Sequence, residues 1–231
     1  MSPSSPNSDH PTPPHSNRPS SPKRKSPRKE APSRSETSKL PPFDGLRLDQ
    51  IFVPTDETAC RHAVKTMIEA GIVGFDTEAK PTFRRGQKSD GPHVVQFALS
   101  DKAYIFQLQH AAAEQAAAEI IEARDILKVG FGLKNDRGQI RNRLGIELQH
   151  VLDLDEVFRQ LGYRGQIGVR GAIGVLLRKG FKKSKSTTTS NWAKLELTAA
   201  QLLYAANDAY AALKIIETLE KNGMLDPSHL E

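Results

Sequence analysis

The chain has 231 residues, enough for one enzyme-sized domain and a tail, and its 37% hydrophobic content can build a substantial core. Its single cysteine excludes an internal disulfide framework, and no apolar run approaches the roughly 20 residues needed to span a bilayer. The polar, proline-rich N-terminus also lacks the apolar core of a signal peptide. These features predict an intracellular protein without a membrane partner, cytoplasmic or, in a eukaryotic cell, nuclear.

The net charge of +6 is unevenly distributed along the chain. Residues 1–40 carry eight Lys or Arg side chains against three carboxylates, and they hold few aliphatic side chains. Such a segment cannot bury enough apolar surface to offset the entropy lost on ordering, so it is predicted to be a disordered basic tail ahead of a domain at 41–231. Its basic patch at 23–29 fits a phosphate-binding arm, a nuclear-import signal or a solubilising tail.

Apolar periodicity and turn residues predict alternating helices and strands after this tail. Thr55 is the expected cap of the first helix, and Gly71 ends it. The predicted elements are a helix over about 56–70, strands over 72–77, 94–99 and 103–106, a helix over 111–124, a strand over 126–130, a helix through 136–144, a strand over 151–154, helices near 155–161 and 169–179, a polar basic loop over 180–197 and a last helix over 198–222. This order predicts an α/β domain with a mixed five-stranded sheet and helices on both faces.

Two carboxylates stand at the exit of the strand over 72–77. Asp76 and Glu78 project to the same face because side chains alternate along a strand, so they can hold one divalent cation between them. Taken alone, an Asp-x-Glu pair is also typical of a solvated strand end. Thr77, between them, is expected to contribute only backbone.

Two further stretches carry acids. Asp136 begins a helix after the strand over 126–130, where an acid is commonly a cap or a partner of the helix dipole. Tyr204 and Asp208 share one face of the last helix at a spacing of four residues. A buried Tyr-Asp hydrogen bond would explain that pair equally well.

Together the three stretches resemble the tyrosine-containing (DEDDy) branch of the DEDD 3′-5′ exonuclease superfamily, with its ribonuclease-H-like three-layer α/β/α fold. Gln96, the stretch Lys128-Val129-Gly130 and the sequence Ser190-Asn191-Trp192 match the same pattern. The approach from Ser190 to the Tyr204–Tyr210 stretch is similar to Werner-type exonuclease domains and, more distantly, to ribonuclease D.

The resemblance implies a site and a reaction. Asp76, Glu78 and Asp208 would bind one Mg²⁺ or Mn²⁺ ion, and Asp76 with Asp136 a second. Tyr204 would orient the water that attacks the terminal phosphodiester. The implied partner is a nucleic acid with a free 3′ end, DNA rather than RNA, and the implied product is a nucleoside 5′-monophosphate.

Two basic segments are candidate substrate contacts. The loop after Glu78 contains Phe83, Arg84 and Arg85, which suit a single-stranded 3′ end or belong to a mobile solvated loop. Three lysines ahead of the last helix form either a phosphate track or a solvated helix end: Lys182, Lys183 and Lys185. Trp192 is expected to anchor its loop to the core.

Two other functions remain compatible with the sequence. The same chemistry on RNA would make the protein a 3′-end-trimming ribonuclease of ribonuclease D type. A non-catalytic nucleic-acid-binding module could also keep the fold. Retention of the four acids and Tyr204 favours an enzyme, because a pure binder has no use for clustered carboxylates beside a phosphate backbone.

Overall fold

The computed structural model describes residues 28–82, 86 and 89–225. Its centre is a mixed sheet with the strand order β1-β4-β3-β2-β5-β6, in which β3 runs antiparallel to both neighbours and the other pairings are parallel. The strands are β1 (Ile51–Phe52), β2 (Ile72–Glu78), β3 (Val94–Ala98), β4 (Ala103–Gln107), β5 (Leu127–Gly130) and β6 (Val151–Asp153). The sheet has six strands rather than the expected five because the two-residue β1 pairs with β4.

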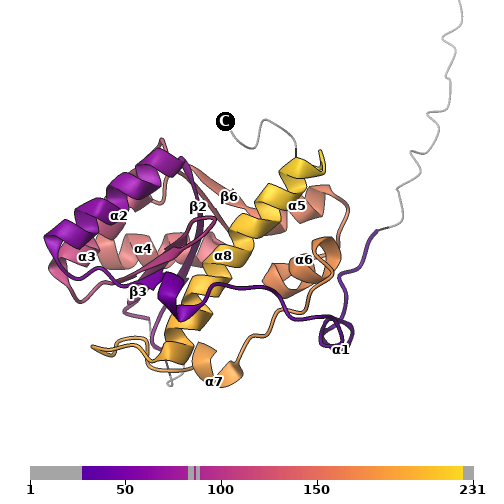
Figure 1. The fold of residues 1–231 in the computed structure, drawn as a ribbon, viewed down its shortest axis with the longest axis horizontal. Helices are drawn as coiled ribbons and strands as arrows, with labels where there is room; N and C mark the ends of the chain where they lie inside the picture. Colours follow the sequence, from indigo (N-terminus) through magenta and orange to yellow (C-terminus); the bar gives the residue numbers. More distant parts are fainter. Residues whose placement is uncertain (1–27, 83–85, 87–88, 226–231) are drawn as a thin grey trace, which may run out of the picture.

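Helices cover both faces of this sheet (Figure 1). The helices α2, α3 and α4 pack on one face, and α5, α6 and the long α8 pack on the other. In chain order the helices are α1 (Arg34–Thr37), the 3-10 turn η1 (Leu48–Gln50), α2 (Glu57–Ala70), α3 (Ala111–Glu122), α4 (Lys134–Leu144), α5 (Leu154–Gln160), α6 (Gly168–Leu176), α7 (Lys185–Thr188) and α8 (Ala199–Lys221). The three-layer α/β/α architecture is therefore confirmed. No helix among the described residues is long and apolar enough to cross a membrane.

Helix ends follow the local chemistry of the sequence. Asp56, one residue after the expected Thr55, caps α2, and its side chain accepts a hydrogen bond from the Ala59 backbone. Gly71 ends α2 in the left-handed conformation. Thr198 opens α8 in the expected capping box. The loop expected over 180–197 contains the short α7.

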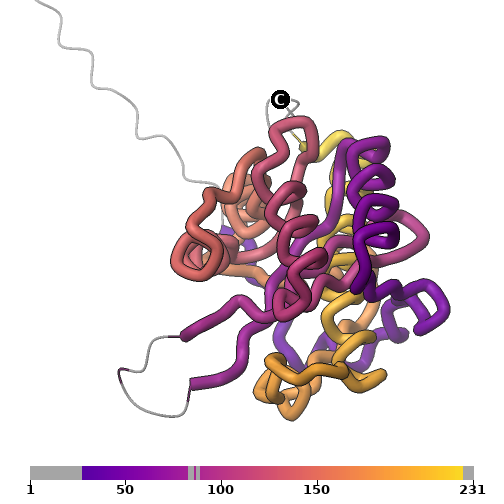
Figure 2. The backbone as a smooth tube through the Cα atoms, turned by 90° about the vertical axis from the view of Figure 1, so that its left-hand side faces the viewer, coloured from indigo at the N-terminus to yellow at the C-terminus, as the bar shows by residue number. Residues whose placement is uncertain are grey.

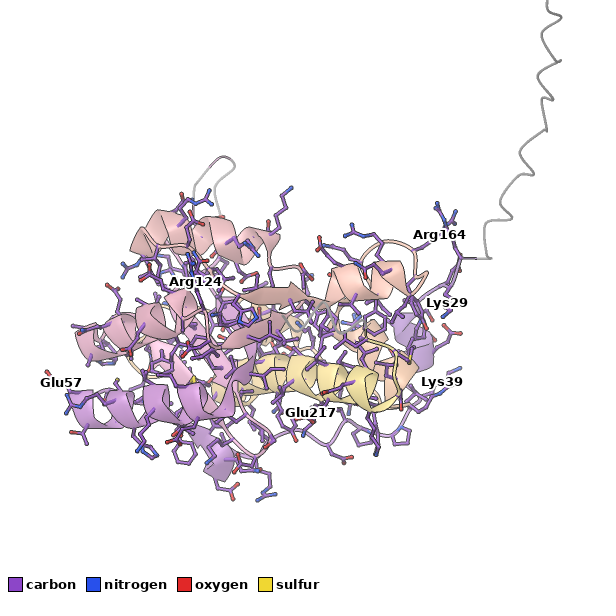
Figure 3. All side chains as sticks on the ribbon, turned by 90° about the horizontal axis from the view of Figure 1, so that it is seen from above. Lys29, Lys39, Glu57, Arg124, Arg164 and Glu217 are labelled. Atoms are coloured by element: carbon purple, nitrogen blue, oxygen red, sulfur yellow. The ribbon has the colours of Figure 1, made fainter. Side chains whose placement is uncertain are left out.

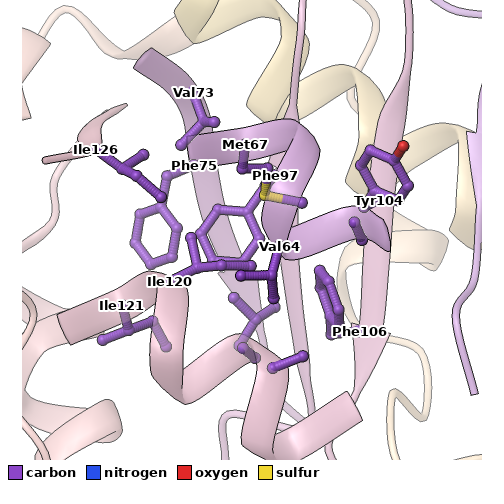
Figure 4. Close-up of a cluster of buried hydrophobic side chains, with 14 of the residues drawn as sticks. Val64, Met67, Val73, Phe75, Phe97, Tyr104, Phe106, Ile120, Ile121 and Ile126 are labelled. Carbon is purple, nitrogen blue, oxygen red and sulfur yellow. The ribbon is translucent and has the colours of Figure 1, made fainter. Parts of the chain in front are cut away.

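One face of the central strand β2 belongs to an aromatic core. Phe75 packs on Phe97 with ring centroids 5.5 Å apart, and Phe97 in turn meets Phe106 edge-on. Figure 4 shows these rings between the sheet and the aliphatic side chains of α2 and α3, such as Met67 and Ile120. This face fixes β2 in the middle of the sheet.

The other face of β2 lies very close to α8. A Cβ atom added to Gly74 would stand 1.9 Å from the Ala209 carbonyl oxygen, so only glycine allows this approach. The small side chains of Ala205, Ala206 and Ala209 on α8 are fully buried beneath the sheet. Close packing at this point brings the exit of β2 against the N-terminal half of α8.

Residues 28–40 correct the predicted boundary of the tail. They follow a defined path that includes α1 and a bridge between Lys29 and Tyr163. Small side chains make this possible: Thr37 is 2% exposed and fits with Pro32 against Gly174 of α6. Residues 1–27, most of the predicted tail, lie outside the described residues, as do Phe83, Arg84 and Arg85. The flanking stretches 79–82 and 89–92 leave the body of the domain together (Figure 2).

Candidate active site

Three carboxylates converge between β2 and α8. Asp76 and Glu78 leave the exit of β2 on the face toward α8, and Asp208 meets them from the helix. Each offers an oxygen atom, and these atoms lie within 4.8 Å of one another. The alternation of side chains on β2 and the close approach at Gly74 thus produce the cluster predicted from Asp-x-Glu and Tyr-x-x-x-Asp.

Asp136 joins the site from α4 by a different route. It is buried, and its Oδ1 atom accepts a hydrogen bond of 2.5 Å from the Thr77 hydroxyl. The turn ahead of α4 is fixed by Asp153 at the end of β6, whose carboxylate accepts hydrogen bonds from the backbone of Gly132 at 3.0 Å and Leu133 at 2.9 Å. Thr77 therefore contributes its side chain, not backbone alone. Neither the side-chain role of Thr77 nor the role of Asp153 was predicted. The position of Asp153 between a strand and a helix could have indicated a capping role.

Tyr204 lies one helical turn before Asp208. Its hydroxyl oxygen accepts a hydrogen bond of 3.0 Å from the Thr188 hydroxyl of α7. Its ring packs on Trp192 with centroids 5.9 Å apart, and Trp192 is 1% exposed, which confirms its expected role as a core anchor. The start of α8 holds the same loop, because the Gln201 side chain donates hydrogen bonds to Ser190 and Asn191. The Ser-Asn-Trp motif thus orients Tyr204.

Lys183 lies in the carboxylate cluster instead of on an exposed phosphate track. Its Nζ atom stands 2.6 Å from Asp208 Oδ2, and its side chain is 30% exposed. The same atom lies 5.6 Å from the centre of the Tyr204 ring. Of the other predicted substrate contacts, Lys182 and Lys185 are exposed to solvent and remain free to meet a substrate.

Burial and mutual repulsion shift the ionisation of the cluster. Burial, followed by the charges of Asp76 and Asp208, raises the pKa of Glu78 to about 9. Burial and the neighbouring Asp136 and Asp208 likewise raise the pKa of Asp76 well above its usual value. For Asp208, burial raises the pKa while Lys183 opposes the shift. Among the described residues, the site therefore holds more carboxyl groups than its one lysine can compensate, and without a metal ion Glu78 keeps its proton at neutral pH.

The other two titratable groups are shifted upward as well. Burial alone would lower the pKa of Lys183, but Asp208 and Asp76 outweigh it and raise that pKa above its usual value. Burial, with the charge of Asp208, raises the pKa of the Tyr204 phenol. At neutral pH, Lys183 is a cation and Tyr204 keeps its proton.

The cluster has the properties of a divalent-cation site. Both Asp208 oxygens are buried. Within the described part of the chain, Oδ1 accepts no hydrogen bond and Oδ2 forms an ion pair with Lys183. A buried carboxylate left in this state is costly unless a cation or a proton satisfies it. Carboxylate oxygens are the hard ligands that Mg²⁺ and Mn²⁺ prefer. The residues present therefore fit a metal centre.

The three-layer fold, the four acids and the adjacent tyrosine define a metal-dependent phosphodiester hydrolase of the ribonuclease-H-like class. A family model described as 3′-5′ exonuclease matches residues 51–223, and the chain belongs to this family. The match covers all five residues of the predicted site.

Individual relatives agree with this assignment. The mouse bifunctional 3′-5′ exonuclease/ATP-dependent helicase WRN is 31% identical over 158 residues, which make up 67% of this chain and 11% of the mouse protein. A 3′-5′ exonuclease of Arabidopsis thaliana is 30% identical over 156 residues, 66% of this chain and 54% of the plant protein. The crystal structure of the Aedes aegypti Nibbler EXO domain superposes with a TM-score of 0.66 at 22% identity, covering 80% of this chain and 95% of that domain. The chain thus spans about half or less of the two full-length relatives.

Proposed function

We propose that this protein is a 3′-5′ exonuclease that hydrolyses the terminal phosphodiester of a DNA strand and releases nucleoside 5′-monophosphates. The observation that carries the proposal is the convergence of Asp76, Glu78 and Asp208 within 4.8 Å of one another. DNA is favoured because the motifs from Ser190 to Tyr210 resemble Werner-type domains more closely than ribonuclease D.

Each acid has a defined part in this reaction. Asp76, Glu78 and Asp208 would hold one Mg²⁺ or Mn²⁺ ion, and Asp76 with Asp136 a second. Two such ions, when bound, supply positive charge to both the attacking and the leaving oxygen of an in-line displacement. The Thr77 hydroxyl holds Asp136 in place through its hydrogen bond.

Tyr204 positions the attacking water. Thr188 donates to the phenol oxygen, which leaves the phenol proton available for a second partner on the carboxylate side. Since its pKa is raised, Tyr204 stays protonated at neutral pH and works as a hydrogen-bond donor rather than as a base.

A role as a non-catalytic binding module is disfavoured by the energetics of the cluster. The fold keeps several carboxylates buried beside one another although this raises the pKa values of Asp76, Glu78 and Asp208. Such an arrangement destabilises the folded state and would repel a phosphate backbone. A metal-assisted reaction explains the grouping of these carboxylates, because they would serve as ligands of the metal ions.

Digestion of labelled DNA and RNA tests the proposal. Each polymer is offered as a single strand and with a recessed 3′ end, in Mg²⁺, in Mn²⁺ and in a chelator, and the products are separated by chromatography. We expect 5′-mononucleotides from DNA only when metal is present. Faster digestion of RNA than of DNA would indicate that the protein is a 3′-end-trimming ribonuclease instead. Internal fragments, or no digestion of any substrate, would overturn the assignment.

A further inference from the structure

The N-terminal arm, defined as residues 28–46, is bound to the domain at three points. Its backbone bridges to Tyr163 at Lys29 and to Gly180 at Pro42. The Asn207 side chain of α8 then accepts a hydrogen bond of 2.6 Å from the Leu46 backbone. Figure 1 shows the arm, in indigo, running from α1 across α8 to η1. The arm is therefore a wall of the folded domain.

Glycine 180 makes one of these attachments possible. A Cβ atom there would stand 2.6 Å from the Thr37 carbonyl oxygen and 3.2 Å from that of Leu40. The Gly180 N–H donates to Pro41 at 2.7 Å, and the Phe43 N–H donates to Gly180 at 3.0 Å. This contact fixes the arm directly beside the loop that carries Lys182 and Lys183.

Between the arm, α6 and this loop lies a cleft of about 540 Å³, here named the basic cleft. Of the residues that the structure describes, four cationic side chains and no carboxylate line it: Arg34, Arg170, Lys182 and Lys183. Among the described residues, Arg34, Arg170 and Lys182 form no ion pair. The nearby Asp44 is already paired with Lys179 at 3.1 Å. The cleft thus presents positive charge that the described part of the chain does not neutralise.

The basic cleft leads to the candidate active site. Lys183 lines it and also lines a second cleft of about 440 Å³ that contains Asp76 and Asp208. A polymer lying along the arm would therefore reach the carboxylates by passing Lys183. Leu40, Pro42 and Phe181 give the wall apolar surface as well, which suits the sugars between phosphates.

We propose that the basic cleft binds the phosphodiester backbone of single-stranded nucleic acid on the 5′ side of the bond that is cleaved. The inference rests on the proposed exonuclease function for the direction of the strand. Arg34 contacts phosphates from the arm, Arg170 from α6 and Lys182 from the loop after Gly180. Residues 28–50 lie outside the family match at 51–223.

Charge reversal on the arm tests the basic cleft. Arg34→Glu changes an exposed side chain, and Arg124→Glu is its matched control, because Arg124 is also exposed and free of ion pairs within the described chain. Figure 3 shows Arg124 in the other half of the molecule from Lys39 and Arg164. Arg170→Gln serves as a second variant, on α6. Thermal unfolding of each variant checks its fold.

Affinity is measured in Ca²⁺ for a single strand of about a dozen nucleotides and for a dinucleotide, across a salt series. One phosphate contact on a single strand contributes about 0.7 to the slope of log Kobs against log salt, or about five-fold in affinity near 0.1 M salt. Arg170→Gln should lose about this much on the long strand, and Arg34→Glu at least this much because it also adds a negative charge. Each should lose less than about two-fold on the dinucleotide. Arg124→Glu should match wild type on both.

Two results would overturn the proposal. The first is an Arg34→Glu affinity and salt slope equal to those of Arg124→Glu on the long strand. The second is an equal loss on both substrates, which would mean a general electrostatic effect. Digestion of the same two substrates by wild type in Mg²⁺ tests the exonuclease function separately. If wild type digests neither substrate, the affinities measured in Ca²⁺ still decide whether the basic cleft binds the strand.

Discussion

The two faces of β2 are opposite environments built on one strand. On the side of α2 and α3, Val73 and Phe75 are packed among apolar side chains and almost fully buried. On the side of α8, Asp76 and Glu78 meet Asp208 with one lysine for compensation. The first face stabilises the domain, whereas the second destabilises it until a cation binds. Stability and activity should therefore respond separately to substitutions one residue apart.

Loss of a carboxylate should have the largest effect on activity. We expect Asp76→Ala and Glu78→Ala to reduce turnover by at least roughly 10³-fold, because each removes a metal ligand. Without metal, neither variant should melt below wild type, since each relieves repulsion among buried acids. Nuclease assays and thermal unfolding in a chelator measure the two effects. Wild-type turnover in either variant would refute the site.

Asp208→Ala should differ from those two variants in its stability. It should also abolish activity, but it leaves Lys183 without its partner at 2.6 Å, so its melting temperature in a chelator should fall below that of wild type. An Asp208→Ala protein as stable as Asp76→Ala would show that the lysine contributes little to folding.

Substitution on the apolar face should have the reverse profile. Phe75→Ala removes a ring that is 1% exposed and leaves a cavity against Phe97, which should lower the free energy of unfolding by about 3 to 5 kcal/mol. Urea unfolding in a chelator, compared with Asp76→Ala, measures this. A Phe75→Ala change of under about 1 kcal/mol would mean that the two faces are not divided as described.

Tyr204→Phe should be milder than loss of a ligand. It removes one positioning hydrogen bond and leaves the carboxylates intact, so kcat should fall by about 10²-fold with little change in KM. The ring packing on Trp192 is kept, and the melting temperature should stay near that of wild type. Full activity in this variant would show that the hydroxyl serves only to anchor Thr188.

Lys183→Met should move stability and metal affinity in opposite directions. The metal-free variant should melt a few degrees lower, because the acids lose their counterion. Its affinity for Mn²⁺ should rise several-fold, since the cation no longer competes with a lysine for Asp208. Calorimetric titration with Mn²⁺ measures the affinity, with the exposed Lys185→Met as the control. Weaker Mn²⁺ binding by Lys183→Met would contradict this account.

A further expected effect is a dependence of stability on pH. Because the folded protein raises the pKa of Glu78 from 4.5 to about 9, it retains a proton that the unfolded chain releases in this window. The resulting stabilisation is complete below about pH 4.5 and is lost as the pH rises through about 9. In a chelator, wild type should lose stability more steeply than Glu78→Gln across this range. Parallel curves of stability against pH for the two proteins would show that the pKa of Glu78 is not raised in the folded state.

Much of this arrangement could be predicted because it depends on local spacing. Asp76 and Glu78 share a face through strand alternation, and Tyr204 and Asp208 through helical periodicity. The pattern of strands and helices then placed β2 inside the sheet. The two-residue β1 escaped prediction because Ile51 and Phe52 are too few to show alternation, and only their pairing with β4 makes them a strand.

The position of Lys183 could not be predicted for a different reason. It depends on contacts between Gly180 and residues 37–43, which are about 140 positions earlier in the sequence. From sequence alone, Lys182, Lys183 and Lys185 looked equivalent, yet the path of the loop turns only Lys183 inward. Similarly, residues 28–40 hold few of the aliphatic residues that mark an ordered segment. Their order comes from Pro32 and Thr37 fitting against a glycine on α6.

The attachment of the arm also decides where the chain can be shortened. A recombinant fragment that starts at residue 41, the boundary that composition alone indicates, would lose Thr37 and Pro32 from their contacts with Gly174. It would uncover part of α6, including the surface around Gly174. Newly exposed apolar surface of this kind promotes aggregation. Crystallisation and solution work should therefore begin the chain before Arg28.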